Sequence, residues 1–161
     1  GTGWWKYEFC YGRTVVQYHV ARDGSKTMID LGKFDKQKHI DWIDAHPAKK
    51  PKPLGQRKQL SHLYSDGSVC DKTGKLRQTE VRLKCVEAVS GSPSSVSLFL
   101  LEPKTCEYIL GVESPLICKI LDYADEYGLI SEAAVGNFEE AKTLQKPEDE
   151  GEVKKIIHDE H

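Results

Sequence analysis

Six side chains in this sequence together offer the chemistry that recognises a polyhydroxylated ligand. A planar amide and a forked guanidinium can each bridge two neighbouring hydroxyls, because every hydroxyl both donates and accepts a hydrogen bond. A carboxylate adds acceptors, a phenol adds one more hydroxyl, and indole faces cover apolar C–H patches at little entropic cost. These residues are Gln17, Arg77, Glu102, Tyr108, Trp4 and Trp5. They predict a hexose-binding site in which the charged Arg77 and Glu102 make the strongest hydrogen bonds.

The cysteines indicate a disulfide framework around these residues. Five of them stand at positions 10, 70, 85, 106 and 118, too far apart for a zinc site, which uses pairs of cysteines two to four residues apart. An odd number leaves one thiol over, and Cys10 is the natural outlier because sixty residues separate it from the next cysteine. Disulfides require an oxidising compartment, which predicts the lumen of the endoplasmic reticulum or a secreted location.

Length and composition fit one domain followed by an acidic segment. The chain has 161 residues, 39% hydrophobic and 30% charged, and no apolar run approaches the about 18 residues that span a bilayer. We therefore expect no direct membrane insertion. Residues 131–161 carry nine acids and four lysines, a net charge of −5, which leaves +3 for residues 1–130. The prediction is a domain over 1–130 and a mobile or weakly docked acidic tail over 131–161.

A basic stretch lies inside the first part of the chain. Lys49, Lys50 and Lys52 alternate with prolines, and Arg57 and Lys58 follow. No aromatic residues that could stack on bases are interleaved with these cations, so the pattern favours a solvated, proline-stiffened loop over a nucleic-acid site.

The chain pattern predicts a mainly β fold. Seven short stretches alternate apolar and polar residues or are rich in β-branched and aromatic residues, and turn pairs such as Asp23-Gly24 and Asp66-Gly67 separate them. The expected strands cover residues 4–9, 14–20, 26–31, 59–64, 80–86, 95–100 and 106–112. One helical insertion is expected over 35–46, with Asp35 as its N-cap. These elements indicate an antiparallel barrel or sandwich.

Several segments in order resemble the mannose 6-phosphate receptor homology (MRH) domain. The resemblance lies in residues 4–13, in Gln17-Tyr18-His19, in the run from Cys70 through Gly74 to Arg77, and in Leu101-Glu102-Pro103 through Cys106 to Tyr108. The run from Cys106 to Asp122 is most similar to the second such domain of the erlectin branch, which contains lectins of endoplasmic-reticulum quality control. The resemblance extends to about residue 130.

The family resemblance implies a fold, a disulfide pairing and a site. It implies an all-β, flattened antiparallel barrel of two sheets, with disulfides Cys70–Cys106 and Cys85–Cys118 and an upstream partner for Cys10. Gln17, Arg77, Glu102 and Tyr108 would surround one mannose, and Trp4 and Trp5 would lie against its neighbours in an α1,6-linked branch. The implied function is that of a lectin for trimmed high-mannose N-glycans on misfolded glycoproteins in the lumen of the endoplasmic reticulum. The lectin would deliver these glycoproteins to a membrane ubiquitin-ligase adaptor complex for degradation. No phosphate loop matches that of the phosphomannose receptors, so neutral glycan is favoured.

Two other functions remain open at this stage. The domain could be a protein-interaction module that docks on the ligase complex through its basic loop and acidic tail, or a glycosidase subunit that presents glycans to a catalytic chain. An enzyme is not expected, because no nucleophile elbow, phosphate loop or metal motif stands in a convincing context. The site requires no metal and no cofactor. The histidines at 19, 39, 46 and 62 are expected to be structural.

Overall fold

The computed structural model describes residues 4–87 and 92–130, and the side chain of Trp4 is outside this description. Seven strands form: β1 (Trp4–Cys10), β2 (Thr14–Val20), β3 (Lys26–Phe34), β4 (Gln59–Ser65), β5 (Gln78–Cys85), β6 (Ser97–Lys104) and β7 (Glu107–Ser114). Short helical elements accompany them: α1 (Lys36–Ala45), η1 (Pro47–Lys49), α2 (Pro115–Cys118) and η2 (Leu121–Tyr123). The predicted tail over 131–161 lies outside the described residues.

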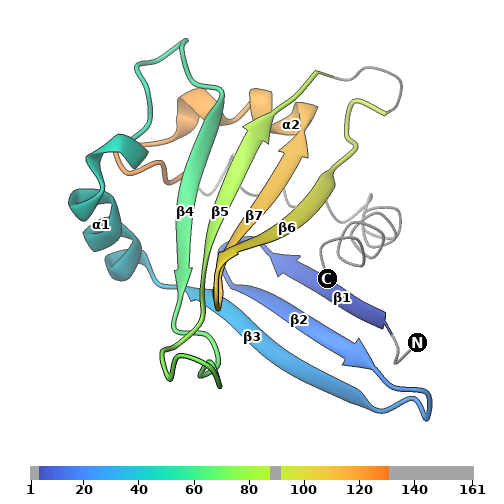
Figure 1. Cartoon of the computed structure of the whole chain (residues 1–161). Helices are drawn as coiled ribbons and strands as arrows, with labels where there is room; N and C mark the ends of the chain where they lie inside the picture. The colour runs from blue at the N-terminus through green and yellow to red at the C-terminus, as the bar shows by residue number, and fades with distance from the viewer. Residues whose placement is uncertain (1–3, 88–91, 131–161) are drawn as a thin grey trace.

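All seven strands belong to one strongly curled sheet in the order β1-β2-β3-β4-β5-β7-β6. Only two register pairs, Lys33 with Ser65 and Phe34 with Tyr64, join β3 to β4. At this narrow junction the sheet turns, so that β1–β3 lie at a steep angle to β4–β7 (Figure 1). The mainly β prediction is confirmed, and the two expected sheets are the two halves of this single curled sheet.

One pairing departs from the expected antiparallel pattern. β6 occupies the edge of the sheet and returns as a hairpin, so β7 enters between β5 and β6 and runs parallel to β5. No local sequence pattern indicates this pairing, because β5 and β6 follow one another in the chain without being neighbours in the sheet. The parallel pairing places the first residues of β5 and β7 side by side, which matters for the site.

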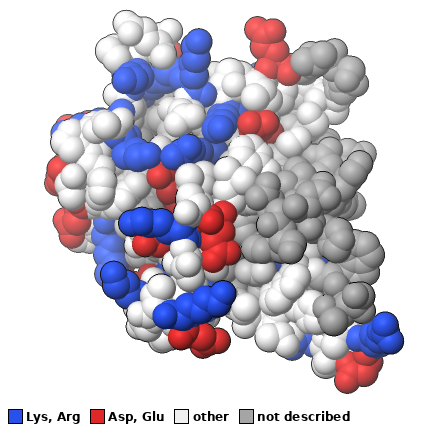
Figure 2. All heavy atoms as spheres, in the orientation of Figure 1, with Lys and Arg blue, Asp and Glu red and all other residues white. Residues whose placement is uncertain are grey.

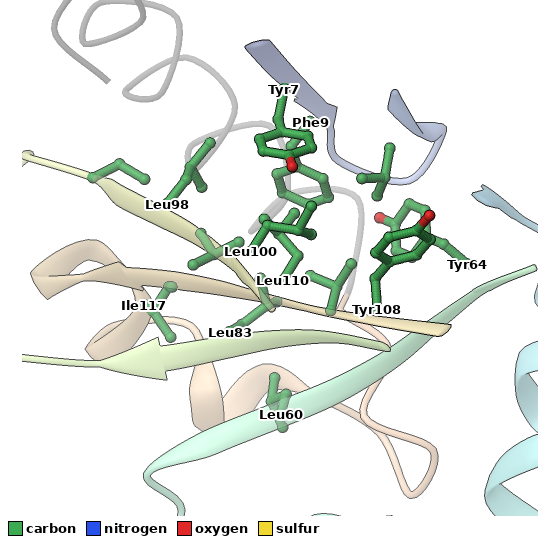
Figure 3. Close-up of a cluster of buried hydrophobic side chains, with 14 of the residues drawn as sticks. Tyr7, Phe9, Leu60, Tyr64, Leu83, Leu98, Leu100, Tyr108, Leu110 and Ile117 are labelled. Atoms are coloured by element: carbon green, nitrogen blue, oxygen red, sulfur yellow. The ribbon is translucent and has the colours of Figure 1, made fainter. Parts of the chain in front are cut away.

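The core lies between the two halves of the sheet. Alternating residues of β1 and β7 point inward, as the two-residue period of a strand requires, and Tyr7, Phe9, Leu100 and Leu110 are among the buried residues. Figure 3 shows Tyr7 and Phe9 on one side of this core and Leu100 and Leu110 on the other. Burial of these large side chains stabilises the curled arrangement, at roughly 25 cal/mol per Å² of apolar surface.

Helix α1 covers the outer side of β4 (Figure 1). Its predicted N-cap is confirmed, because the side chain of Asp35 accepts a hydrogen bond of 3.0 Å from the backbone N–H of Lys38. The inward face buries His39 and Ile43. His39 accepts from the Leu63 backbone N–H through Nδ1 at 3.0 Å, so its Nε2–H donates to the Tyr127 carbonyl at 2.8 Å. His39 thus ties the helix to β4 and to the segment that follows η2.

Two further connections hold the last described residues against the sheet. His62 on β4 donates from Nε2 to the Gly128 carbonyl at 2.6 Å. A disulfide joins Cys85, the last residue of β5, to Cys118, the last residue of α2. Both histidines therefore have structural partners, in agreement with the sequence-based expectation. Among the described residues no helix has the length and apolarity needed to cross a membrane.

Candidate carbohydrate site

The parallel pairing of β5 and β7 brings two of the predicted site residues together. Gln78 pairs with Glu107 and Thr79 with Tyr108, so Arg77, which directly precedes β5, lies beside the start of β7. A disulfide between Cys70 and Cys106, with Cα atoms 6.0 Å apart, fastens the loop before Arg77 to the turn before Tyr108. Both side chains are thereby positioned by covalent and sheet contacts.

Arg77 and Tyr108 form a hydrogen-bonded pair. Arg77 donates from Nε to the Tyr108 hydroxyl at 3.2 Å and from one terminal nitrogen to the Val69 carbonyl at 2.8 Å. These two bonds hold the guanidinium in one plane. Its remaining N–H groups form no hydrogen bond with the described residues and are available to a ligand. Tyr108 is 6% exposed. Burial, with the nearby Glu102 charge, raises the pKa of Tyr108 above 10 although Arg77 opposes the shift, so the phenol stays protonated and can donate.

Glu102 lies where β6 deviates from its regular pairing. The register shifts between Leu101 and Lys104, and one carboxylate oxygen of Glu102 accepts from the Cys106 backbone N–H at 2.9 Å. Cys106 has a positive φ of 64°, which closes this turn. The carboxylate is exposed and near enough for its charge to act on Tyr108. Its second oxygen forms no hydrogen bond within the described part of the chain.

Gln17 comes from the opposite half of the sheet. It is the register partner of Tyr7, and cross-strand partners share a face, so its side chain lies on the inner side with Tyr7. The residue is only 7% exposed. Within residues 4–87 and 92–130 its side-chain amide forms no hydrogen bond, including none to Arg77, Glu102 or Tyr108. A buried amide without partners costs about 1–3 kcal/mol, so it is suited to take its hydrogen bonds from a ligand.

The link between the two halves of the site is a feature that sequence reasoning missed. Ser68 accepts from the Asp30 N–H through its hydroxyl and donates its own N–H to the Asp30 carbonyl, at 2.9 and 2.8 Å. The Arg77 N–H donates to the Ser68 carbonyl at 2.9 Å. Asp30 follows Ile29, the register partner of Gln17. The loop that carries Arg77 is therefore fixed to the strand beside Gln17.

A glycine makes this close approach feasible. A Cβ on Gly67 would lie 2.5 Å from the Asp30 carbonyl oxygen and 3.0 Å from that of Arg77. The only sequence signal for this contact was the Asp66-Gly67-Ser68 triplet, which predicted a turn and gave no indication of its partner.

The two tryptophans are placed at the start of β1. Trp4 pairs with Val20 and Trp5 with His19. The Trp5 ring is partly buried against the core, with its centroid 5.0 Å from that of His19. Trp5 is two residues from Tyr7 and therefore shares the inner face with Gln17. The side chain of Trp4 is outside the description, so its predicted role stays a prediction.

Glu80, a carboxylate outside the predicted site, is engaged by two cations. Glu80 accepts from Lys49 at 3.0 Å and from Arg82 at 2.9 Å. Burial alone would raise its pKa, but these two cations lower it overall, so Glu80 is ionised and engaged. Among the described residues no three His, Cys, Asp or Glu side chains cluster to hold a metal ion. What the site offers is an array of fixed donors and acceptors.

Comparisons with known proteins identify the family. The family model for glucosidase II beta subunit-like proteins matches residues 1–70. Over 135 residues, 81% of this chain, the sequence is 49% identical to human endoplasmic reticulum lectin 1 (erlectin), and over 116 residues, 71% of the chain, it is 37% identical to human protein OS-9. The chain is an MRH domain of the erlectin and OS-9 family. It spans 28% and 17% of the length of these two relatives.

Solved MRH domains are also similar in structure. The MRH domain of Yos9, solved in complex with α3,α6-Man5, matches with a TM-score of 0.47 and 24% identity over 73% of each chain. The mannose-bound MRH domain of glucosidase II beta matches with a TM-score of 0.31 and 23% identity over 73% of this chain and 95% of that one. Homology to lectins rather than enzymes confirms the expectation that this MRH domain is not an enzyme.

Proposed function

We propose that this MRH domain is a lectin that binds mannose in trimmed high-mannose N-glycans. The observation that carries the proposal is the pairing of Arg77 with Tyr108, with Glu102 nearby, together with a buried Gln17 amide that has no partner within the described residues. An amide, a guanidinium, a carboxylate and a protonated phenol match the alternating donors and acceptors of adjacent hydroxyls. The relatives and solved MRH domains include an endoplasmic reticulum lectin and complexes with mannose and Man5, which supports mannose as the sugar.

The finer specificity that we propose is for an exposed α1,6-linked mannose. Trp5 lies on the same inner face as Gln17, at the start of β1, where an indole can cover the C–H face of a second sugar unit. Trp4 is proposed to contribute to the same subsite. A shallow site of this kind binds weakly, with a Kd on the order of micromolar to millimolar, and gains from avidity.

In the cell, we propose, this domain works in the lumen of the endoplasmic reticulum on misfolded glycoproteins. The two disulfides require an oxidising compartment, and the erlectin relative is named for that organelle. Its partners would be high-mannose N-glycans and the adaptor complex of a membrane ubiquitin ligase, leading to endoplasmic-reticulum-associated degradation.

Removal of the client's N-glycans should abolish capture; undiminished capture of a deglycosylated client would favour a protein-docking module instead.

A glycan array with matched variants tests the sugar site. R77A and E102Q should each lower affinity for mannosidase-trimmed glycans by about 10- to 100-fold, because a lost charged hydrogen bond costs about 1.5–3 kcal/mol. Gln17→Leu should lower affinity by about 2- to 10-fold, because a neutral hydrogen bond contributes about 0.5–1.5 kcal/mol. R13A and E107Q are the controls, since Arg13 is exposed and Glu107 lies on β7 next to Tyr108. Equal losses in the controls, or retained affinity in R77A and E102Q, would place the site elsewhere.

A further inference from the structure

A basic groove lies on the outer face of β4 and β5, away from the sugar site. Its volume is about 470 Å³, and it is lined by neutral residues and by five cations: Lys49, Lys50, Lys52, Lys58 and Arg82. Figure 2 shows Lys and Arg side chains gathered around a hollow on the upper left of the molecule, where the loop between η1 and β4 lies in Figure 1. None of the described residues that line this groove is a carboxylate.

The groove carries more positive charge than its neighbours neutralise. Glu80 pairs with both Lys49 and Arg82, so one anion serves two cations. Within the described ranges Lys50, Lys52 and Lys58 form no ion pair. Concentrating like charges in this way costs free energy in the free domain, and an anionic occupant would relieve that cost.

The loop that forms the groove is held in place. Arg57 donates from Nε to the Lys52 carbonyl at 2.7 Å and from one terminal nitrogen to the Leu121 and Ala124 carbonyls at 2.8 and 3.0 Å. The Gly55 N–H donates to the Asp122 carboxylate at 3.2 Å. The loop is therefore fixed to the segment around η2, and little order has to be gained when a ligand binds.

The type of cation indicates the type of ligand. The unpaired groups are lysines, which are separate point charges, whereas phosphate recognition favours a free arginine fork. The two nearby arginines are already engaged, by Glu80 and by backbone carbonyls. The described lining residues include no aromatic side chain that could stack on a base. A run of carboxylates, as in an acidic polypeptide segment, fits best.

We propose that the occupant is the acidic run of this chain's own C-terminal part, residues 148–152. This run has four acids in five residues: Glu148, Asp149, Glu150 and Glu152. Its tether starts after Ile130, which packs against the core and is bridged to Ala124, whose carbonyl accepts a hydrogen bond from Arg57 in the loop that forms the groove. The 17 residues between 130 and 148 would span about 23 Å as a random-coil linker, which corresponds to an effective concentration on the order of millimolar. An acidic segment of another protein would then have to displace the chain's own acidic run from the groove.

Backbone-amide NMR spectra of the full chain test the contact from the tail side. E148Q/D149N/E150Q/E152Q should shift the amide signals of residues 48–61, and about 0.5 M salt should produce similar shifts in the wild type by screening the charges. The matched control E132Q/E139Q/E140Q/E160Q removes four acids elsewhere in the tail and should leave these signals in place. Unchanged spectra in the first variant, or equal shifts in both, would overturn the proposal.

A synthetic peptide of residues 146–154 tests the groove side. It should bind the variant with the neutralised tail at least about tenfold more tightly than the wild type, whose tethered tail competes. K50Q/K52Q/K58Q on that background should abolish the binding, whereas K33Q/K36Q/K119Q should not. Equal peptide affinity in wild type and tail variant would exclude the tail as occupant, and tighter binding of an oligonucleotide or inorganic phosphate would refute the ligand class. Affinity for glycan should be unchanged throughout, which separates this proposal from the lectin site.

Discussion

Acidification should destabilise this domain chiefly through His62. The residue is 2% exposed, its ring centroid lies 5.3 Å from that of His39, and burial lowers its pKa from 6.5 to about 4. The unfolded chain therefore takes up a proton before the folded chain does. Stability from this group is fully present above pH 6.5, falls as the pH drops from there towards 4, and levels off below. Between about pH 7.5 and 5 the loss is about 2 kcal/mol for this one histidine.

Thermal unfolding as a function of pH measures this loss. An unfolding entropy of about 2.1 cal/mol/K per residue over a domain of this size converts about 2 kcal/mol into a drop in Tm of about 7 °C. Carboxylates also titrate in this range, so the comparison is with His62→Gln, whose amide can still donate to the Gly128 carbonyl. H62Q will be less stable than the wild type at neutral pH. Between about pH 7.5 and 5, however, its free energy of unfolding should fall by about 2 kcal/mol less than that of the wild type.

Two controls separate His62 from other histidines. H46Q removes an exposed histidine and should keep the wild-type dependence on pH. H39Q should reduce the dependence, because burial also lowers the pKa of His39 and a proton on its Nδ1 would displace the hydrogen bond from Leu63. If H62Q and the wild type lose the same stability between these pH values, the buried, neutral state assigned to His62 is wrong.

Two further predictions concern the position of Arg77. Gly67→Ala should lower glycan affinity several-fold, because its Cβ would push the Arg77 loop away from Asp30. Gly24→Ala is the control, since Gly24 has a positive φ and lies in open space. It should lower the stability measured by calorimetry by about 1 kcal/mol and leave glycan affinity unchanged. Replacing both Cys70 and Cys106 by serine should lower the free energy of unfolding by about 4 kcal/mol, as expected for a loop of 36 residues. The molecules that remain folded should also bind the sugar more weakly. Loss of the second disulfide should cost similar stability without changing that affinity; the reverse pattern would contradict the arrangement of the site.

Much of the local structure was predictable because local rules govern it. The period of two in β5 places Val81 and Leu83 in the core, and the Asp35 cap marks the helix boundary within one residue. The segments that resemble the MRH family also led to the family that the comparisons show. Each of these signals is contained in a short stretch of sequence, where side-chain alternation or a capping hydrogen bond decides the outcome.

Long-range geometry could not be predicted in the same way. The parallel pairing of β5 with β7 depends on β6 taking the sheet edge, and no local pattern records that choice. The contact of Ser68 with Asp30 joins residues 38 positions apart, and both read in the sequence as ordinary turn or strand residues. Arg57 appeared to be one cation of a solvated loop, whereas its hydrogen bonds to Leu121 and Ala124 anchor that loop.

These long-range contacts explain how a sugar could influence the fold as well as bind to it. The two halves of the sheet are joined between β3 and β4 by only two register pairs, and the proposed sugar ligands are divided between them, with Gln17 on one half and Arg77 and Tyr108 on the other. A mannose that bonds to both halves bridges the narrow junction. A mannose that bound only the curled arrangement would stabilise that arrangement by RT ln(1 + [L]/Kd), about 2.7 kcal/mol at a concentration of 100 Kd. The Asp30–Ser68–Arg77 connection holds the Arg77 loop on β3 before any ligand binds, which lowers the ordering cost that the sugar would have to meet.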